Sequence, residues 1–246
     1  MKKPFFLFPG LACNERLFAA QKYGLNNILK VIIPEWIRPT GKDQLETFAL
    51  RWAADVWETY YSENALPENR LNPADGCYVG GHSFGGMVAP IAGEFFEKKG
   101  IPVYGCFRFA SASTPEEIPE KWLILGRMLN VFPDGAWLTI KTFCYLKLIF
   151  PLQKLTPLKE ELYLQIVESP VRRSFHIVRM LYSWKGMEEK KYDFPVICIR
   201  GTNDSVLPSR NVSKDVILLP HAGHGMMMTQ GAKLNDLIRN FIFANS

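Results

Sequence analysis

The sequence feature that most constrains the fold is the stretch Gly-His-Ser-Phe-Gly at residues 81–85. An apolar run at residues 76–80 ends just before it, and a helical pattern begins within it, at Phe84. A serine on such a sharp strand-to-helix turn is held in a strained backbone conformation, with its hydroxyl exposed above the sheet. The flanking positions are glycine because a side chain there would clash across the turn. Ser83 is therefore predicted to be an exposed nucleophile.

Apolar, strand-like runs alternate with helical patterns along the chain. Strands are predicted at residues 5–8, 31–33, 77–80, 103–110, 195–199 and 216–219. Helical spacing of apolar residues predicts helices over residues 45–56, 84–99 and 234–242. This alternation predicts an α/β fold, with a mostly parallel sheet flanked by helices on both faces. The length of 246 residues fits a single domain over residues 1–246.

Two helix boundaries have sequence signals of their own. Asp43 followed by Glu46 three residues later resembles a capping box and predicts that a helix starts there. The run Lys98-Lys99-Gly100 predicts a helix end, because cations favour the negative end of a helix and glycine stops it.

The alternation is interrupted between about residues 115 and 191. This stretch has helical spacing and several prolines, and it predicts a helical lid inserted over the carboxyl edge of the sheet. Its large apolar side chains predict a substrate with a mainly apolar acyl or aryl group; they are Trp122, Leu123, Phe132, Trp137, Phe143, Tyr145, Leu148 and Phe150.

The charge pattern argues against several classes of partner. The net charge is +5, but the basic residues are spread out and form no run longer than two. No nucleic-acid motif is present, so we expect no nucleic-acid partner. The sequence contains no metal-ligand spacing and no phosphate-binding glycine-rich loop, and it predicts neither a metal nor a cofactor.

The cysteines and the first residues bear on location. Five cysteines, an odd number without a Cys-x-x-Cys pair, are typical of reduced thiols and predict a cytoplasmic protein. The apolar run at residues 5–8 is too short for a signal peptide and is better explained as a strand. No segment is long and apolar enough to cross a membrane.

A serine hydroxyl reacts at neutral pH only when a base takes its proton and an acid orients that base. His224 lies in a loop just after the last predicted strand, and Asp204 follows the strand before it. Both loops are expected at the carboxyl edge of the sheet, where ligands bind in such folds. The chain order Ser83, Asp204, His224 is therefore a candidate catalytic triad.

Other residues are weaker candidates for the base and the acid. His221 lies only two residues after the predicted strand, His82 is expected to pack beside the turn, and His176 belongs to the predicted lid. Asp193 and Asp215 each precede a strand and so lie at the wrong edge of the sheet.

Three further features allow more than one interpretation. Methionines 226–228 could line a pocket beside His224, although core packing is their commoner use. The pair Arg172-Arg173 could bind an anionic carrier or form a solvated helix face. Cys13 is not well placed to be a nucleophile.

Three motifs together resemble the α/β-hydrolase superfamily. They are Gly-His-Ser-Phe-Gly-Gly at residues 81–86, Gly-Thr-Asn-Asp-Ser-Val-Leu-Pro at 201–208, and His-Ala-Gly-His-Gly at 221–225. The resemblance implies Ser83 as nucleophile, His224 as base and Asp204 as its orienting acid. It also implies a sheet that lacks the first two strands of larger members.

Acyl transfer also needs hydrogen-bond donors for the oxyanion. One is expected to be the backbone N–H of Phe84, the residue after the nucleophile. By analogy with the family, the second is the backbone N–H of Leu11. The chain has Pro9-Gly10 where a common family pattern has His-Gly. The side chain that supports this loop is therefore expected to differ from that of the family pattern.

The resulting hypothesis is a serine hydrolase that cleaves a small carboxylic ester or thioester through an acyl-serine intermediate. A carbon–carbon or carbon–oxygen lyase or an acyltransferase with the same triad is an alternative, since a fold does not fix a reaction. A binding module of the same fold without catalysis is another. Haloalkane dehalogenases and epoxide hydrolases are disfavoured, because both need an aspartate where this chain has Ser83. The sequence leaves the oligomeric state open.

Overall fold

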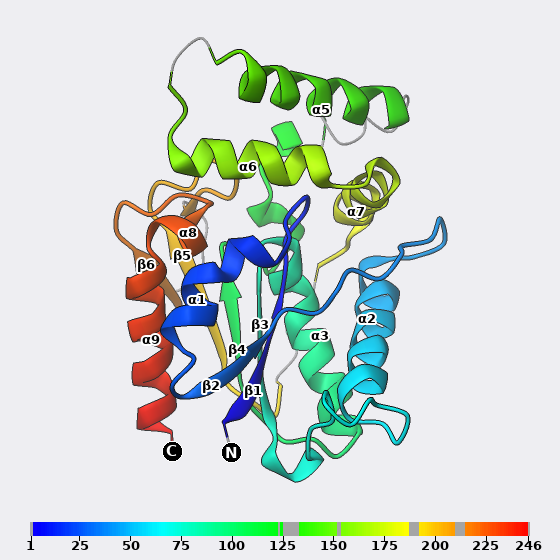
Figure 1. Ribbon diagram of the computed structural model, residues 1–246, viewed down its shortest axis with the longest axis vertical. Coiled ribbons are helices and arrows are strands. Elements are labelled where there is room, and N and C mark those ends of the chain that lie inside the picture. The colour runs from blue at the N-terminus through cyan, green and yellow to red at the C-terminus, as the bar shows by residue number, and fades with distance from the viewer. Residues whose placement is uncertain are drawn as a thin grey trace.

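All six strands of the central sheet run parallel, in the order β2-β1-β3-β4-β5-β6 (Figure 1). This computed structural model describes residues 2–122, 124, 133–151, 154–186, 192–209 and 215–245. The strands are β1 (Lys3–Phe8), β2 (Leu29–Ile32), β3 (Cys77–His82), β4 (Val103–Phe109), β5 (Val196–Gly201) and β6 (Val216–Leu219). The predicted parallel sheet flanked by helices is confirmed.

Helices cover both faces of this sheet. The α-helices are α1 (Ala19–Gly24), α2 (Leu45–Tyr60), α3 (Phe84–Lys98), α5 (Pro133–Ile149), α6 (Pro157–Glu168), α7 (Val171–Ser183), α8 (Met226–Thr229) and α9 (Gly231–Ala244). Short 3₁₀ turns are η1 (Glu15–Phe18), η2 (Pro73–Asp75) and η3 (Pro115–Glu117). Figure 1 shows α2 and α3 on one side of the sheet and α1 and α9 on the other.

The side chains of β1 alternate between the two hydrophobic cores. Phe6 and Phe8 belong to the core that α2 and α3 cover, whereas Phe5 and Leu7 belong to the core under α9. All four are fully buried. Successive side chains of a strand point to opposite faces, so a strand covered on both sides is apolar at every position. This explains the uninterrupted apolar run in the sequence.

The start of α2 differs from the prediction. Gln44 is the N-cap, and Thr47, not Glu46, completes the capping box by accepting from the backbone N–H of Gln44 at 2.9 Å. The Asp43 carboxylate instead accepts hydrogen bonds from the Thr40 N–H and the Arg51 guanidinium, each at 2.6 Å. The predicted box at Asp43 is wrong because that carboxylate closes the preceding turn.

The stretch between β4 and β5 contains the helices α5, α6 and α7 in its described parts. Figure 1 shows α5, α6 and α7 above the carboxyl ends of the strands, with α5 outermost. Trp137 on α5 is buried. Phe143 on the same helix is 54% exposed, and Phe150, directly after the helix, is 70% exposed. Part of the expected apolar lining is therefore exposed to solvent. Leu123 and Phe132 lie outside the described residues.

All five cysteines are free thiols, and four of them are buried. Cys198 on β5 is partly exposed. Within the ranges given above, no helix is both long and apolar enough to cross a membrane.

Two buried arginines hold the segment after β4 against the sheet. Arg200 on β5 forms an ion pair with Glu117 of η3 and donates to the carbonyl of Ser111. Arg108 on β4 donates to the carbonyl of Ala112 and to the Ser113 hydroxyl in this segment. It also donates to the carbonyl of Gly86 at 2.9 Å, in the first turn of α3. The Arg200–Glu117 pair is nearly excluded from solvent, so each charge depends on the other for compensation.

This dependence predicts a large effect of breaking the pair. Glu117→Gln leaves the Arg200 charge buried without a carboxylate, and we expect the free energy of unfolding to fall by about 3 kcal/mol or more. Urea denaturation measures the change. The double variant Glu117→Leu/Arg200→Met removes both charges and should be more stable than the single variant. Equal stability of Glu117→Gln and the wild type would contradict the prediction.

Candidate active site

Ser83 lies on the strained turn that the sequence predicts. Its backbone has φ 53° and ψ −117°, in a region that residues other than glycine rarely adopt. The turn is fixed by two hydrogen bonds, from the Ser83 N–H to the Phe109 carbonyl at 2.9 Å and from the Gly86 N–H to the Ser83 carbonyl at 3.0 Å. The residue remains partly exposed between two buried neighbours. The hydroxyl is thereby presented at the carboxyl edge of the sheet.

The flanking glycines allow this turn to form. A Cβ added at Gly81 would lie 2.2 Å from the carbonyl oxygen of Gly85. A Cβ added at Gly85 would lie 2.0 Å from the carbonyl oxygen of Phe8 in β1. Both contacts are far shorter than real Cβ atoms make, so neither position accepts a side chain without backbone movement. The turn is thus packed backbone to backbone against β1.

Asp204 and His224 meet above the sheet, as their chain order predicts. The Asp204 Oδ2 atom accepts a hydrogen bond from His224 Nδ1 at 2.8 Å, and the aspartate side chain is fully buried. Its Oδ1 accepts the N–H groups of Val206 and Leu207 at 2.8 and 2.9 Å. Burial alone would raise the pKa of Asp204, but the hydrogen bond and charge of His224 and these two N–H groups lower it below its usual value.

The loops that carry these two residues are joined by backbone contacts. The N–H of Asn203 donates to the carbonyl of Ala222 at 2.9 Å, and the His221 N–H donates to the Thr202 hydroxyl at 2.8 Å. Because β5 and β6 are adjacent and parallel, their carboxyl ends hold the two loops side by side. His221 itself is exposed and lies outside the site.

His82 connects the serine turn to the His224 loop. Its Nε2 lies 2.8 Å from the carbonyl oxygen of His224, and the two rings are 4.8 Å apart. The carbonyl can only accept, so Nε2 carries the proton and Nδ1 is left as a buried acceptor without a partner. Burial, and secondly the charge of His224, lowers the pKa of His82 to about 3. His82 is therefore a neutral residue that positions the backbone of His224, a role the sequence did not reveal.

The loop after β1 approaches Ser83 closely. A Cβ added at Gly10 would lie 3.2 Å from the Cβ of Ser83, and the Cys13 N–H closes the loop onto the Gly10 carbonyl at 3.0 Å. Neither the N–H of Leu11 nor that of Phe84 has a hydrogen-bond acceptor in the described part of the chain. Both expected oxyanion donors are thus near the serine and without an acceptor.

Trp36 supports this loop and was not found from the sequence. Its indole N–H donates to the carbonyl of Cys13 at 2.9 Å. Its ring is stacked on Trp52 at 4.5 Å and on Phe84 at 6.2 Å. A tryptophan from another part of the chain therefore fixes the loop that contains Pro9-Gly10. A single tryptophan in a predicted loop gives no sequence signal for such a contact.

Helix α6 spans the distance between the two loops of the site. Near its start, Leu158 lies 3.1 Å from where a Cβ on Gly225 would be, next to His224. Near its end, the Gln165 side chain accepts the N–H of Asn14 at 3.2 Å. Arg16, after this loop, forms ion pairs with two glutamates of α6, Glu161 and Glu168, each at 2.6 Å. The helical insertion is thus attached at both sides of the serine.

The remaining candidate residues lie outside the site or are unreactive. Asp193 and Asp215 are exposed. Met226 and Met227 are buried in the core under α9. Burial raises the pKa of the Cys13 thiol to about 12, which keeps it protonated.

His176 lies on α7, and burial lowers its pKa below the usual value. No group of three metal-ligating side chains occurs in the ranges that the structure describes.

Comparison with solved structures identifies the fold. The chain is similar to a thermophilic esterase from Thermogutta terrifontis, with 16% identity and a TM-score of 0.65, over 100% of this chain and 92% of that one. It is also similar to a carboxylesterase of the thaumarchaeon Nitrososphaera gargenis, with 15% identity and a TM-score of 0.67, over 99% and 90% of the two chains. An epoxide hydrolase of the α/β-hydrolase superfamily from hot-environment metagenomes has 12% identity and a TM-score of 0.61, over 98% and 91%.

These similarities show that the chain has the α/β-hydrolase fold. No protein-family model matches the sequence, and no curated protein is significantly similar to it. At such low identities the likeness concerns the fold, and the chemistry has to be argued from the residues of the site.

The buried His82 predicts a specific dependence of stability on pH. A histidine in the unfolded chain has a pKa of about 6.5, so acidification below that value protonates the unfolded chain while folded His82 stays neutral. The unfolded state then binds more protons, and stability decreases as the pH falls from about 6.5 towards about 3. Between pH 7 and pH 5 we expect His82 to account for a loss of about 2 kcal/mol.

Urea denaturation of the wild type and of His82→Gln at both pH values checks this expectation. Glutamine keeps a donor for the His224 carbonyl but does not titrate. The variant should therefore lose less stability on acidification than the wild type. Equal losses in the two proteins would show that His82 is accessible to protons in the folded state.

Proposed function

We propose that this protein is a serine hydrolase that cleaves a carboxylic ester or thioester through an acyl-serine intermediate. The observation that carries the proposal is the hydrogen-bonded Asp204–His224 pair beside the strained turn of Ser83. His82, the residue before the serine, holds the backbone of His224 and so places the pair next to the turn. A nucleophile, a base and an orienting acid are the minimum that acyl transfer from serine requires.

The reaction follows from these positions. Ser83 Oγ attacks the carbonyl carbon of the substrate while His224 accepts the serine proton. The buried Asp204 stabilises the protonated imidazole, and the N–H groups of Leu11 and Phe84 stabilise the oxyanion. His224 then returns the proton to the leaving alcohol or thiol. Water, deprotonated by His224, releases the acid from Ser83.

The proton path between Ser83 and His224 is completed on substrate binding. The Ser83 hydroxyl makes no hydrogen bond to any residue in the described ranges. Catalytic hydrogen bonds are often long in free enzymes and tighten in the substrate complex. The N–H groups of Leu11 and Phe84 have no acceptor in the described part of the chain, and both are therefore free to donate to an oxygen atom of the substrate.

The helical insertion, residues 115–191, is proposed to act as a lid within one domain of residues 1–246. Its support is α6, which contacts the chain on both sides of Ser83. Such a layer limits water near the acyl-enzyme and selects substrates by shape. A small-molecule substrate and a cytoplasmic location remain predictions of the sequence.

The alternatives differ in what they do with Ser83. A lyase or an acyltransferase can use the same triad, whereas a binding module has no reactive serine. Esterases are among the structurally similar proteins, which supports hydrolysis without excluding the other reactions. The hydrolase is favoured over the binding module because the hydrogen-bonded Asp204–His224 pair is needed to activate a serine and is not needed to bind a ligand.

Single substitutions in the triad test the proposal. Ser83→Ala and His224→Ala should each lower kcat for p-nitrophenyl esters by about 10³-fold or more, with folding nearly unchanged. Asp204→Asn should lower kcat by about 10²-fold or more, because the histidine loses its charged partner. Ser183→Ala, at the exposed end of α7, is a matched control and should keep full activity. Full activity of Asp204→Asn would mean that another acid orients His224.

Labelling with a fluorophosphonate separates the alternatives. The wild type should be labelled at Ser83, and Ser83→Ala should not. Labelling without ester hydrolysis would favour a lyase or an acyltransferase. Neither labelling nor hydrolysis would overturn the proposed function in favour of a binding module.

A further inference from the structure

Arg173 on α7 is a partly buried arginine without a carboxylate partner in the described part of the chain. Four other arginines of the protein, Arg16, Arg51, Arg200 and Arg239, each form an ion pair with an aspartate or a glutamate. Arg173 contacts none. A charge removed from water is costly unless an opposite charge or several hydrogen bonds compensate it.

The guanidinium group of Arg173 has few hydrogen bonds of its own. Its Nε atom is buried without an acceptor, and Nη2 reaches only the Ser169 hydroxyl, at the long distance of 3.5 Å. Nη1 donates to no described residue. Burial lowers the pKa of Arg173 below its usual value. The neighbouring Cys13 thiol does not supply a compensating charge, because burial keeps it protonated. The positive charge is therefore present and uncompensated.

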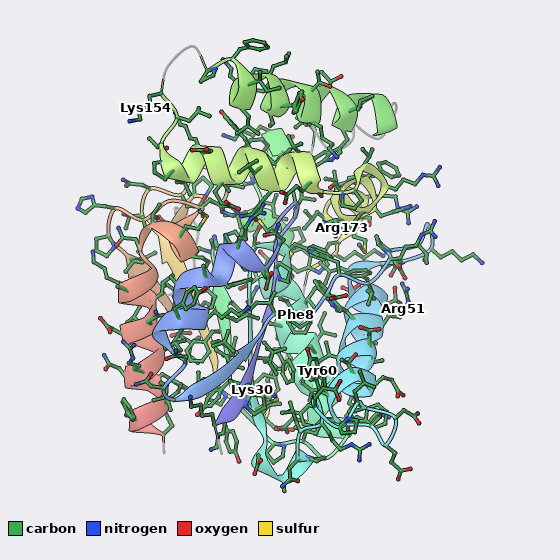
Figure 2. The ribbon with its side chains drawn as sticks, viewed as in Figure 1. Phe8, Lys30, Arg51, Tyr60, Lys154 and Arg173 are labelled. Atoms are coloured by element: carbon green, nitrogen blue, oxygen red, sulfur yellow. The ribbon has the colours of Figure 1, made fainter. Side chains whose placement is uncertain are left out.

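Arg173 lies close to the proposed oxyanion loop. Its Cζ atom is 4.9 Å from the centre of the Trp36 ring, and the same ring is stacked on Phe84. The indole N–H of Trp36 donates to Cys13, two residues after Leu11. Figure 2 shows Arg173 on the side of α7 that faces the rest of the molecule. One aromatic ring thus separates the uncompensated charge from the residue that follows Ser83.

We infer that Arg173 binds a carboxylate group of the substrate. This inference rests on the proposed function and narrows it to esters or thioesters that carry a carboxylate elsewhere in the same molecule. A guanidinium presents paired N–H groups that match the two oxygens of a carboxylate, and its outer edge, Nη1 and Nη2, holds the donors left without a good acceptor. Trp36 makes a cation–π contact with the guanidinium, which holds the charged group beside the loop before the substrate arrives.

The neighbouring Arg172 has a different environment and serves as the matched control. It is exposed, one position along the same helix. Arg172→Gln removes the same charge from the same region, so any effect of net charge alone appears in both variants. Arg173→Gln keeps a polar side chain of similar shape while removing the cation.

Pairs of esters of equal length test the inference. The monomethyl esters of succinic, glutaric and adipic acid carry a free carboxylate, and methyl butanoate, pentanoate and hexanoate are their neutral counterparts. For at least one length, the wild type should prefer the anionic ester in kcat/KM. Arg173→Gln should lower kcat/KM for that ester by about ten-fold or more, mostly through KM, and change the neutral ester by less than about two-fold. Arg172→Gln should affect both esters equally.

Arg173→Lys keeps the charge without the planar fork and should lie between the wild type and Arg173→Gln. It also provides the test if Arg173→Gln does not fold. Loss of activity for anionic and neutral esters alike in both Arg173 variants would show a structural role and overturn the inference. Preference for neutral esters in the wild type would overturn it as well, while the proposed function would stand.

Binding without turnover separates the inference from the proposed function. Calorimetry should show that glutarate binds Ser83→Ala and binds Ser83→Ala/Arg173→Gln at least ten-fold more weakly. If no ester is hydrolysed and Ser83 is not labelled, the proposed function fails, and this measurement alone decides whether Arg173 binds a carboxylate. Equal glutarate binding by the two proteins, or no binding, overturns the inference. Tighter binding of inorganic phosphate than of glutarate would overturn the assignment to a carboxylate.

Discussion

The contact on which the rest of the structure depends is the backbone-to-backbone packing of the Ser83 turn against β1. Gly81 faces the carbonyl of Gly85, and Gly85 faces the carbonyl of Phe8, at distances that leave no room for a side chain. This packing holds Ser83 in its strained conformation, because the strands on either side and the first turn of α3 fix both ends of the turn. It also fixes the distance between β1 and α3, and so places Gly10 and Leu11 beside the serine.

Buried polar groups around this turn form a connected set. Asp204 fixes the ring of His224, and His82 fixes the backbone of His224 to the serine turn. Arg108 and Arg200 donate hydrogen bonds to the segment after β4, and the charge of Arg200 is compensated by Glu117. Hydrogen bonds in a low-dielectric interior specify one arrangement strongly, since any unpaired member is costly. Next to the proposed site, Arg173 has a buried Nε atom without an acceptor and no carboxylate partner in the described chain.

Much of the fold and the proposed triad could be predicted from local sequence patterns. Apolar runs identified the six strands, and the order of Ser83, Asp204 and His224 identified residues that parallel strands bring to one edge. The start of α2 was predicted at the wrong residue, because Arg51 and Thr40 engage Asp43 in a way that the spacing of the residues does not reveal. The apolar residues of α5 could not be divided into covered and exposed ones, since α5 has no clear apolar face.

The sequence by itself determined the elements, their parallel arrangement and the chemical groups available at the carboxyl edge of the sheet. These depend on the local spacing of apolar residues and on the glycines at residues 81 and 85, both of which can be read directly from the sequence. Only the tertiary structure decided that His82 bonds the His224 backbone, that Trp36 supports the loop at Leu11, and that Arg173 lacks a carboxylate partner in the described chain. The contacts of His82 and Trp36 join residues far apart in the chain, and the surroundings of Arg173 are likewise set by how the layers pack rather than by any local pattern.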